Sequence, residues 1–127
     1  MGDVPDDLKY TEEHEWVRVD GDEVCIGITD FAQTALTEVV WVELPEIETQ
    51  VSAMESFASV ESVKSVSEIY APVTGTVTEV NQSLEDSPEQ INEDPYGSGW
   101  ICKIKVGDDL DISGLLDSES YSALIGE

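Results

Sequence analysis

The chain has 127 residues, the size of one domain with a single core. Its 29 Asp and Glu residues against five Lys and Arg give a formal net charge of −24. This charge argues against binding to nucleic acid, which needs basic contacts to phosphate, and to anionic membrane surfaces. Acidic groups at this density repel one another, and about 1 M salt screens that repulsion because the Debye length falls to roughly 3 Å. The composition therefore predicts a protein from the cytoplasm of a salt-accumulating halophile. An ordinary acidic protein is the alternative.

The N-terminus has no pattern of an export signal. Its first eight residues are acidic and polar, whereas a signal peptide has a basic segment followed by an apolar one. We expect residues 1–8 to form a frayed end. The chain also has no apolar run long enough to span a bilayer. The sequence thus predicts a soluble, cytoplasmic monomer in which residues 1–127 form a single domain.

Two cysteines, Cys25 and Cys102, lie far apart in the chain and outside any Cys-x-x-Cys motif. Each is inside a short apolar run, which is typical of a small buried side chain in a reducing compartment. A disulfide between them is the alternative that the sequence leaves open.

Short apolar or alternating segments separated by turn residues are typical of strands. Strands are predicted, in chain order, at 15–20, 23–28, 38–44, 54–62, 66–70, 75–81 and 100–106. The first two are joined by Asp20-Gly21-Asp22 and so predict a hairpin. The remaining strands follow one another without the helix alternation of a parallel sheet.

Two short helices are predicted at the periphery. One covers 31–36 and is capped by Thr29 or Asp30, and the other covers 118–125 and is capped by Asp117. The second belongs to a C-terminal helical cap over 114–126. Loops or turns are expected at 46–53, 81–99 and 107–113, with a helical turn inside 81–99 as an alternative. The fold class is therefore mostly β, a small antiparallel sandwich or flattened barrel.

Lys64 is the one basic residue between Arg18 and Lys103. It stands between two predicted strands, in the tetrapeptide Ser62-Val63-Lys64-Ser65, which fits a tight reversal. The sequence therefore predicts that Lys64 lies at the tip of a hairpin and points into solvent. One interpretation is that this position requires an amine for its function. The other is that the lysine only keeps the turn soluble.

The neighbours of Lys64 argue against catalysis by this residue. A nucleophilic lysine needs burial or a nearby cation to lose its proton, and Glu61 and Glu68 act in the opposite direction. An exposed lysine is better suited to covalent modification, because acylation would make it the base of a long mobile arm.

The rest of the sequence offers no catalytic or metal centre. His14 is the only histidine, no Gly-x-Ser-x-Gly accompanies it, and a structural role near Trp16 is the simpler interpretation. The acidic runs lack the spacing of a calcium loop, and no Gly-rich phosphate loop is present. We therefore expect neither catalytic residues nor a metal.

Several motifs in order resemble the lipoyl-carrier H proteins of the glycine cleavage system. They cover roughly residues 9–106 and consist of 9–11 with 14–17, 26–30 with 32–33, 42–45, 60–64, 67–68 with 71–73 and 75, 80–81, and 91–96 with 99–100. The chain departs from the family at Phe31, often histidine, and at Gln50 and Ala58, usually glycine. None of these departures touches Glu61-Ser62-Val63-Lys64.

The resemblance implies a lipoyl/biotinyl-carrier fold with lipoate attached covalently to Lys64. It implies a non-catalytic carrier whose arm accepts an aminomethyl group from the pyridoxal-phosphate enzyme glycine decarboxylase. The arm would deliver this unit to the tetrahydrofolate-dependent aminomethyltransferase, and lipoamide dehydrogenase would reoxidise it. A lipoate ligase or lipoyltransferase would attach the cofactor. Glu15 and Glu68 match acidic positions of the family, and we expect them to contact the arm.

Other readings stay open. A biotin carrier also modifies a hairpin lysine, but its signature places Met on both sides, where this chain has Val63 and Ser65. A lipoyl domain serving another complex, a lipoyl donor for other enzymes, and an unmodified acidic scaffold are the remaining alternatives. The sequence does not fix the lipoylation state or the route of attachment.

Overall fold

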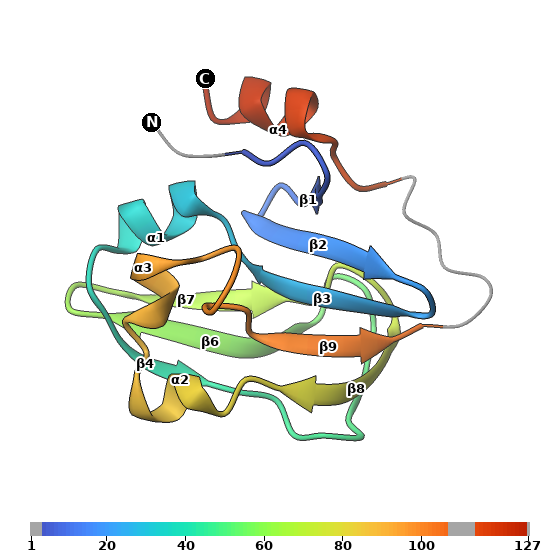
Figure 1. The fold of residues 1–127 in the computed structure, drawn as a ribbon, viewed down its shortest axis with the longest axis horizontal. Coiled ribbons are helices and arrows are strands. Elements are labelled where there is room, and N and C mark those ends of the chain that lie inside the picture. The colour runs from blue at the N-terminus through green and yellow to red at the C-terminus, as the bar shows by residue number, and fades with distance from the viewer. Residues whose placement is uncertain (1–3, 107–113, 127) are drawn as a thin grey trace.

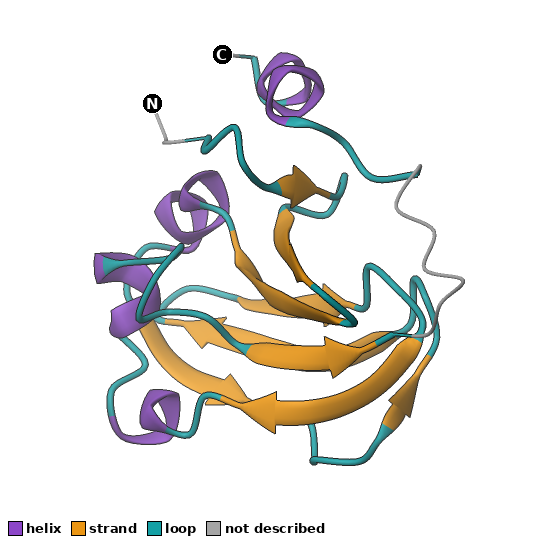
Figure 2. Cartoon of the chain, turned by 45° about the vertical axis from the view of Figure 1, so that its right-hand side comes forward, coloured by secondary structure: helices purple, strands orange, loops and turns teal. Residues whose placement is uncertain are grey.

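A computed structural model describes residues 4–106 and 114–126 of the chain. Its described strands form two antiparallel sheets rather than a closed barrel (Figures 1 and 2). The larger sheet has the order β1 (Lys9–Tyr10), β2 (Glu15–Asp20), β3 (Glu23–Ile28), β9 (Cys102–Lys105), β8 (Gly75–Val80), β5 (Gln50–Val51). The smaller sheet has the order β4 (Val39–Glu43), β6 (Ser56–Ser62), β7 (Val66–Tyr70). The predicted mostly β sandwich is confirmed.

Four short helices are described: α1 (Asp30–Leu36), α2 (Ser83–Asp86), α3 (Gln90–Glu93) and α4 (Ser118–Leu124). The two predicted helices are confirmed as α1, capped by Thr29, and α4, capped by Asp117. The segment 81–99, predicted as a long loop with a helical turn as an alternative, contains the two further short helices α2 and α3. Four residues are too few for a helical apolar period. None of the helices in the described part of the chain has the length and apolar character needed to cross a membrane.

The strands β1 and β5 were also missed, since each is only two residues long. The predicted turn at 107–113 lies outside the described residues.

The main core lies between the two sheets. Alternate residues of β3 point into it, among them Val24 and Ile26, and they meet Val60 and Ile69 from the smaller sheet. Side chains of successive strand residues point to opposite faces, so the other residues of β3 face away from this core. This alternation explains why the pattern of apolar residues predicted the strands well.

A second, smaller apolar cluster covers the outer face of the larger sheet. Tyr121 of α4 is fully buried there and stacks on Tyr10 of β1, with ring centroids 4.7 Å apart. Leu8 is also buried, Val4 packs against the cluster, and the Tyr10 hydroxyl donates a hydrogen bond to the carbonyl of Pro5. We expected residues 1–8 to be frayed; of the described ones, Leu8 packs in this cluster, whereas Asp6 and Asp7 are exposed.

The two cysteines lie on opposite faces of the larger sheet. Cys25 is paired with Lys103 across β3 and β9, while Cys102 is paired with Ile26. Paired residues share a face and neighbours along a strand do not, so the thiols point away from each other. Cys25 packs in the outer cluster and Cys102 in the main core, and both are free. The alternative of a disulfide was therefore wrong.

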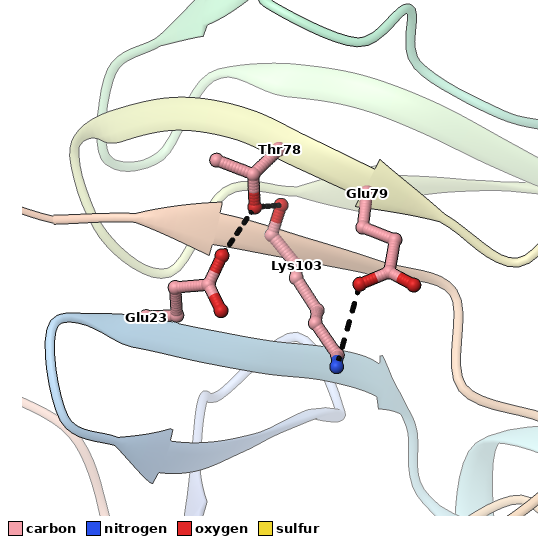
Figure 3. Close-up of polar contacts among 4 residues, drawn as sticks. All are labelled: Glu23, Thr78, Glu79 and Lys103. Atoms are coloured by element: carbon pink, nitrogen blue, oxygen red, sulfur yellow. Dashed lines mark hydrogen bonds and ion pairs between the residues drawn. The ribbon is translucent and has the colours of Figure 1, made fainter.

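Polar contacts join three strands of the larger sheet (Figure 3). The register shifts between Val77 and Glu79, which makes Thr78 an extra residue of β8. Its hydroxyl donates to Glu23 Oε2 of β3 at 2.7 Å. Next to it, Lys103 Nζ of β9 lies 3.4 Å from Glu79 Oε2, forming an ion pair.

Candidate carrier site

Lys64 lies in the turn between β6 and β7, as the sequence predicts. The last paired residues before the turn are Glu61 and Val66, and Lys64 is exposed. In Figure 1 this turn is at the left end of the smaller sheet, on the same side as α1, α2 and α3. The structure therefore presents the lysine at one end of the molecule.

The side chain of Ser62 closes this turn. Ser62 is 5 % exposed, and its Oγ accepts hydrogen bonds from the backbone N–H groups of Lys64 at 3.3 Å and Ser65 at 3.1 Å. The same hydroxyl lies 3.2 Å from the carbonyl of Ser65, to which it donates. The Ser62 N–H donates to that carbonyl as well, at 2.8 Å. One buried hydroxyl thus satisfies the backbone of the turn and holds the base of the lysine in place.

The turn is also attached to the neighbouring strand. The N–H of Val63 donates to the carbonyl of Glu38, just before β4, at 3.1 Å. The side chains of Val63 and Val66 are 64 % and 63 % exposed, so they flank Lys64 with apolar surface instead of packing in the core. The backbone at the lysine is fixed while its side chain extends into solvent.

The amine of Lys64 has no ionic partner in the described part of the chain, where Lys103 and Glu79 form the one ion pair. The acidic neighbours expected from the sequence do not contact it. Glu61 lies in β6 opposite Val66, and Glu68 Oε2 accepts a hydrogen bond from Ser56 Oγ at 2.8 Å. An exposed amine without an ion pair is free to be acylated.

A groove of about 290 Å³ begins beside the turn and runs between α1 and β7. Its lining includes His14, Phe31 and the first residues of β7 as far as Glu68. A second hollow of about 370 Å³ continues past Glu13, which lines both, and includes Glu15 and Tyr70. The two hollows follow one another along β7, and the first begins at Ser65, next to Lys64.

His14 is held at the edge of this groove by the C-terminal helix. Its Nδ1 lies 2.8 Å from the hydroxyl of Tyr121, which lies 2.7 Å from Thr29 Oγ1. The His14 ring packs against Phe31 with centroids 4.9 Å apart. Burial lowers the pKa of His14 below its usual 6.5, with Glu13 acting weakly in the other direction. The structural role predicted for His14 agrees with these contacts, although its partner is Tyr121.

Glu15 is a buried carboxylate, 1 % exposed. One of its oxygens accepts a hydrogen bond from the hydroxyl of Thr11, and the other accepts one from the N–H of Tyr70 at 3.1 Å. Burial raises the pKa of this carboxyl from 4.5 to about 7, and the two hydrogen bonds lower it only in part. Glu15 thus joins β2 to the end of β7 and can change its charge near neutral pH.

Lys64 and Glu68 follow one another along the hairpin, and Glu15 of β2 lies beside the end of β7, where it contacts Tyr70. Glu68 is three residues beyond the turn, or about 10 Å at the rise of a β-strand, and it faces the first hollow. Glu15 contacts Tyr70, two residues further on, and faces the second hollow. No cluster of His, Cys, Asp and Glu suited to a metal ion is found among the described residues.

Reasoning from the sequence missed the residues that position this site. Ser62 closes the turn, and a serine two residues before the lysine in a predicted reversal is a weak signal for that role. Tyr121 contacts His14 from 107 residues away in the chain, and no local pattern indicates such a contact.

Two sheets with an exposed lysine on a hairpin define the fold of the lipoyl/biotinyl-carrier domains. Residues 8–127 match the family model described as glycine cleavage H-protein. The chain is 55 % identical over 124 residues to the glycine cleavage system H protein of Staphylococcus carnosus and 54 % identical over 124 residues to that of Geobacillus thermodenitrificans, with 98 % of both chains covered in each comparison. The crystal structure of the H protein from Mycobacterium marinum is 40 % identical, with a TM-score of 0.87 over 98 % of this chain and 100 % of that chain. The chain belongs to the glycine cleavage H-protein family.

The buried Glu15 should make stability depend on pH in a defined interval. Between about pH 4.5 and 7 the carboxyl is protonated in the folded chain but ionised in the unfolded chain, so the free energy of unfolding falls as pH rises. The stabilisation is complete below this interval and lost above it. In urea unfolding, the wild type should lose roughly 2–3 kcal/mol more than Glu15→Gln between about pH 5 and 8. Glu12→Gln, at an exposed site, serves as the control and should follow the wild type. Equal losses in wild type and Glu15→Gln would contradict the raised pKa.

Proposed function

We propose that Lys64 is the residue that carries lipoate in this chain, and that residues 1–127 act as one carrier domain. The observation that carries the proposal is the turn itself, in which Ser62 fixes the backbone while the lysine amine remains exposed and without an ion pair among the described residues. A lipoyl amide at this position would neutralise a solvated charge without leaving a buried group unpaired.

Membership of the family makes the chain a lipoyl carrier of the glycine cleavage system and not an enzyme in its own right. The proteins of this family carry a covalently attached lipoate on a lysine. When bound, lipoate supplies a dithiolane that can hold a one-carbon unit and take up two electrons. The task left to the protein is to position the arm and protect its load.

We propose that the groove beside α1 receives the arm between visits to other enzymes. Glu68 lies at the distance of an extended lysine arm from the turn, and it is exposed. A carboxylate at this position would attract a protonated amine on the loaded arm. Glu15 lies deeper, and both of its oxygens already accept hydrogen bonds. We infer that Glu68 contacts the loaded arm directly and that Glu15 affects the arm from the second hollow.

The partners proposed for this carrier are the enzymes that load, unload and reoxidise such an arm. They are glycine decarboxylase, the tetrahydrofolate-dependent aminomethyltransferase and lipoamide dehydrogenase, together with a lipoate ligase or lipoyltransferase. Lys64 is exposed and lies beyond the last paired residues of β6 and β7, which supports access by several different active sites in turn.

A second candidate role is lipoyl donation to other complexes, for which the same exposed lysine would serve. The two roles differ in what leaves the protein. A lipoyl donor transfers the lipoyl group itself from Lys64, whereas the carrier transfers only the one-carbon load. Biotin attachment is less favoured, since Val63 and Ser65 stand where a biotin carrier has Met.

Expression in cells supplied with lipoate should increase the intact mass of the chain by one lipoyl group, mapped by peptide analysis to Lys64. Lys64→Arg should abolish the increase, because an arginine side chain does not provide the amine that the ligase acylates. Lys105→Arg, at another exposed lysine, is the matched control and should retain it. An unmodified Lys64, or a lipoyl group on Lys9, Lys103 or Lys105, would overturn the proposal.

Glu68→Gln should shorten the lifetime of the aminomethyl load by several-fold, because an amide attracts a protonated amine less than a carboxylate does. Release of formaldehyde from the loaded carrier, in the absence of partner enzymes, measures that lifetime. Glu15→Gln should have a smaller effect in the same direction. Glu61→Gln, an exposed change near the turn but outside the groove, is the control. Unchanged lifetimes in both Glu68→Gln and Glu15→Gln would remove these residues from the arm site.

We further propose that the chain works in a salt-accumulating cytoplasm. Its 29 acidic residues face only five basic ones, and most of the described carboxylates are exposed. With Lys103 and Glu79 as the one ion pair in the described ranges, these charges are balanced mainly by solvent and ions. The relatives from Staphylococcus and Geobacillus support the family assignment but carry no argument on salt.

Raising KCl from about 0.1 M to about 1 M should increase the melting temperature by roughly 5 °C or more, because the Debye length falls from about 10 Å to about 3 Å. A neutral osmolyte of the same osmolality is the control, since it leaves charge repulsion unscreened. Equal melting temperatures at the two KCl concentrations would contradict the proposal.

A further inference from the structure

A third hollow, away from the two that follow β7, lies where β4 runs into the loop after it. Its volume is about 400 Å³, and it is lined on one side by Trp41 and Ile47 and on the other by Val80 and the start of α2. Trp41 is 52 % exposed and Ile47 is 51 % exposed. Large apolar side chains left this open next to a hollow are typical of a surface that another molecule covers.

A bulge in β4 accounts for the exposure of Trp41. The register with β6 shifts between Val39 and Trp41, so Val40 is an extra residue in the strand. As a result, Val40 and Trp41 both face outward, although alternation would bury one of them. Val39 and Val42 remain buried on either side. The bulge leaves β4 attached to the core through Val39 and Val42, while the consecutive side chains of Val40 and Trp41 are both exposed to solvent.

The position of this surface relates it to the lysine. Trp41 is paired with Glu61 of β6, three residues before Lys64. This separation corresponds to about 10 Å along the strand. A protein that takes the arm of Lys64 into its active site must cover this end of the smaller sheet, and Trp41 lies at the border of that area.

The charges around the hollow indicate the chemistry of its partner. Glu43, Glu46 and Glu85 line it and are exposed, and no Lys or Arg is among its lining residues. A second copy of this chain would bring a further −24 charges to the same rim, which disfavours self-association. A basic surface would instead be attracted to the rim, while an apolar side chain could enter between Trp41 and Ile47.

We propose that this surface, defined by Trp41, Ile47, Glu43, Glu46 and Glu85, is a docking site for a basic protein face that carries an apolar anchor. The partner is an enzyme that acts on the side chain of Lys64 or on its arm, so this inference rests on the proposed carrier function. The docking site holds the partner over the turn while the arm is free to enter the active site.

The test uses the full chain with Lys64→Arg, so that no arm contributes to binding. Its Kd is measured by calorimetry with purified glycine decarboxylase, aminomethyltransferase, lipoamide dehydrogenase and lipoate ligase from one organism. Trp41→Ser and Ile47→Ser should each raise the Kd for at least one of the four enzymes by about fivefold or more. Val19→Ser, a change at a 43 % exposed valine of the other sheet, is the control and should raise no Kd by as much as about fivefold.

The charge requirement is tested with two triple variants of equal net charge. Glu43→Gln with Glu46→Gln and Glu85→Gln should weaken the same complex more than Asp20→Asn with Asp22→Asn and Glu119→Gln, which are exposed residues outside the hollow. Thermal melting of each variant shows whether it folds, and any that does not is replaced by the conservative change Trp41→Leu or Ile47→Ala.

Three results would overturn the docking site. The first is that Trp41→Ser and Ile47→Ser change the Kd by less than about fivefold for all four enzymes. The second is that the arm-free chain binds none of them, and the third is a Trp41-dependent dimer in sedimentation, which would assign the surface to a second copy. Failure of the carrier function is a separate result, seen as an unmodified Lys64 in the intact mass of the wild-type chain. The two failures are therefore distinguishable.

Discussion

The hydrogen bonds of the Ser62 hydroxyl are the constraint on which the carrier site depends. A two-stranded hairpin that ends in solvent has few packing contacts near its tip and would otherwise fluctuate. Ser62 is the last buried residue of β6, and its Oγ accepts hydrogen bonds from the N–H groups of Lys64 and Ser65. The bond from Val63 to Glu38 then ties the tip to a third strand. The turn can therefore expose Lys64 and two valines without losing its shape.

The rest of the fold keeps this end of the molecule clear. The main core closes the space between the two sheets, and the outer cluster uses Tyr10, Trp16 and Tyr121 to hold the N-terminal segment and α4 on the far face of the larger sheet. The hydroxyl of Tyr121 reaches through to His14 at the edge of the groove. The C-terminal helix thus supports the wall of the groove without covering the lysine.

The sequence predicted the parts of the fold that local chemistry determines. Period-two patterns located β2, β3, β6, β7 and β8, and the separation of two such runs by a reversal located Lys64. It did not predict the α2 and α3 helices, which are too short to show a period, or the contacts of Ser62, Tyr121 and Glu15. The contacts of Tyr121 and Glu15 depend on which segments become neighbours, as when the N–H of Tyr70 donates to Glu15 from 55 residues away. Those of Ser62 are local, but a serine in a predicted reversal is only a weak signal for them. The bulge that turns Trp41 outward is likewise a property of strand pairing and not of the strand alone.

A carrier that visits several enzymes needs association that is fast and short-lived, and the distribution of charge and apolar surface suits both needs. A net charge of −24 on a small body attracts basic surfaces over distances set by the Debye length, which raises the rate of encounter more than the strength of the complex. At high salt this attraction is weakened, so specificity must come from short-range contacts. At the proposed docking site, the half-exposed side chains of Trp41 and Ile47 would supply such contacts near Lys64. The acidic surface that we propose to require salt for stability would therefore also make a local apolar contact necessary for recognition.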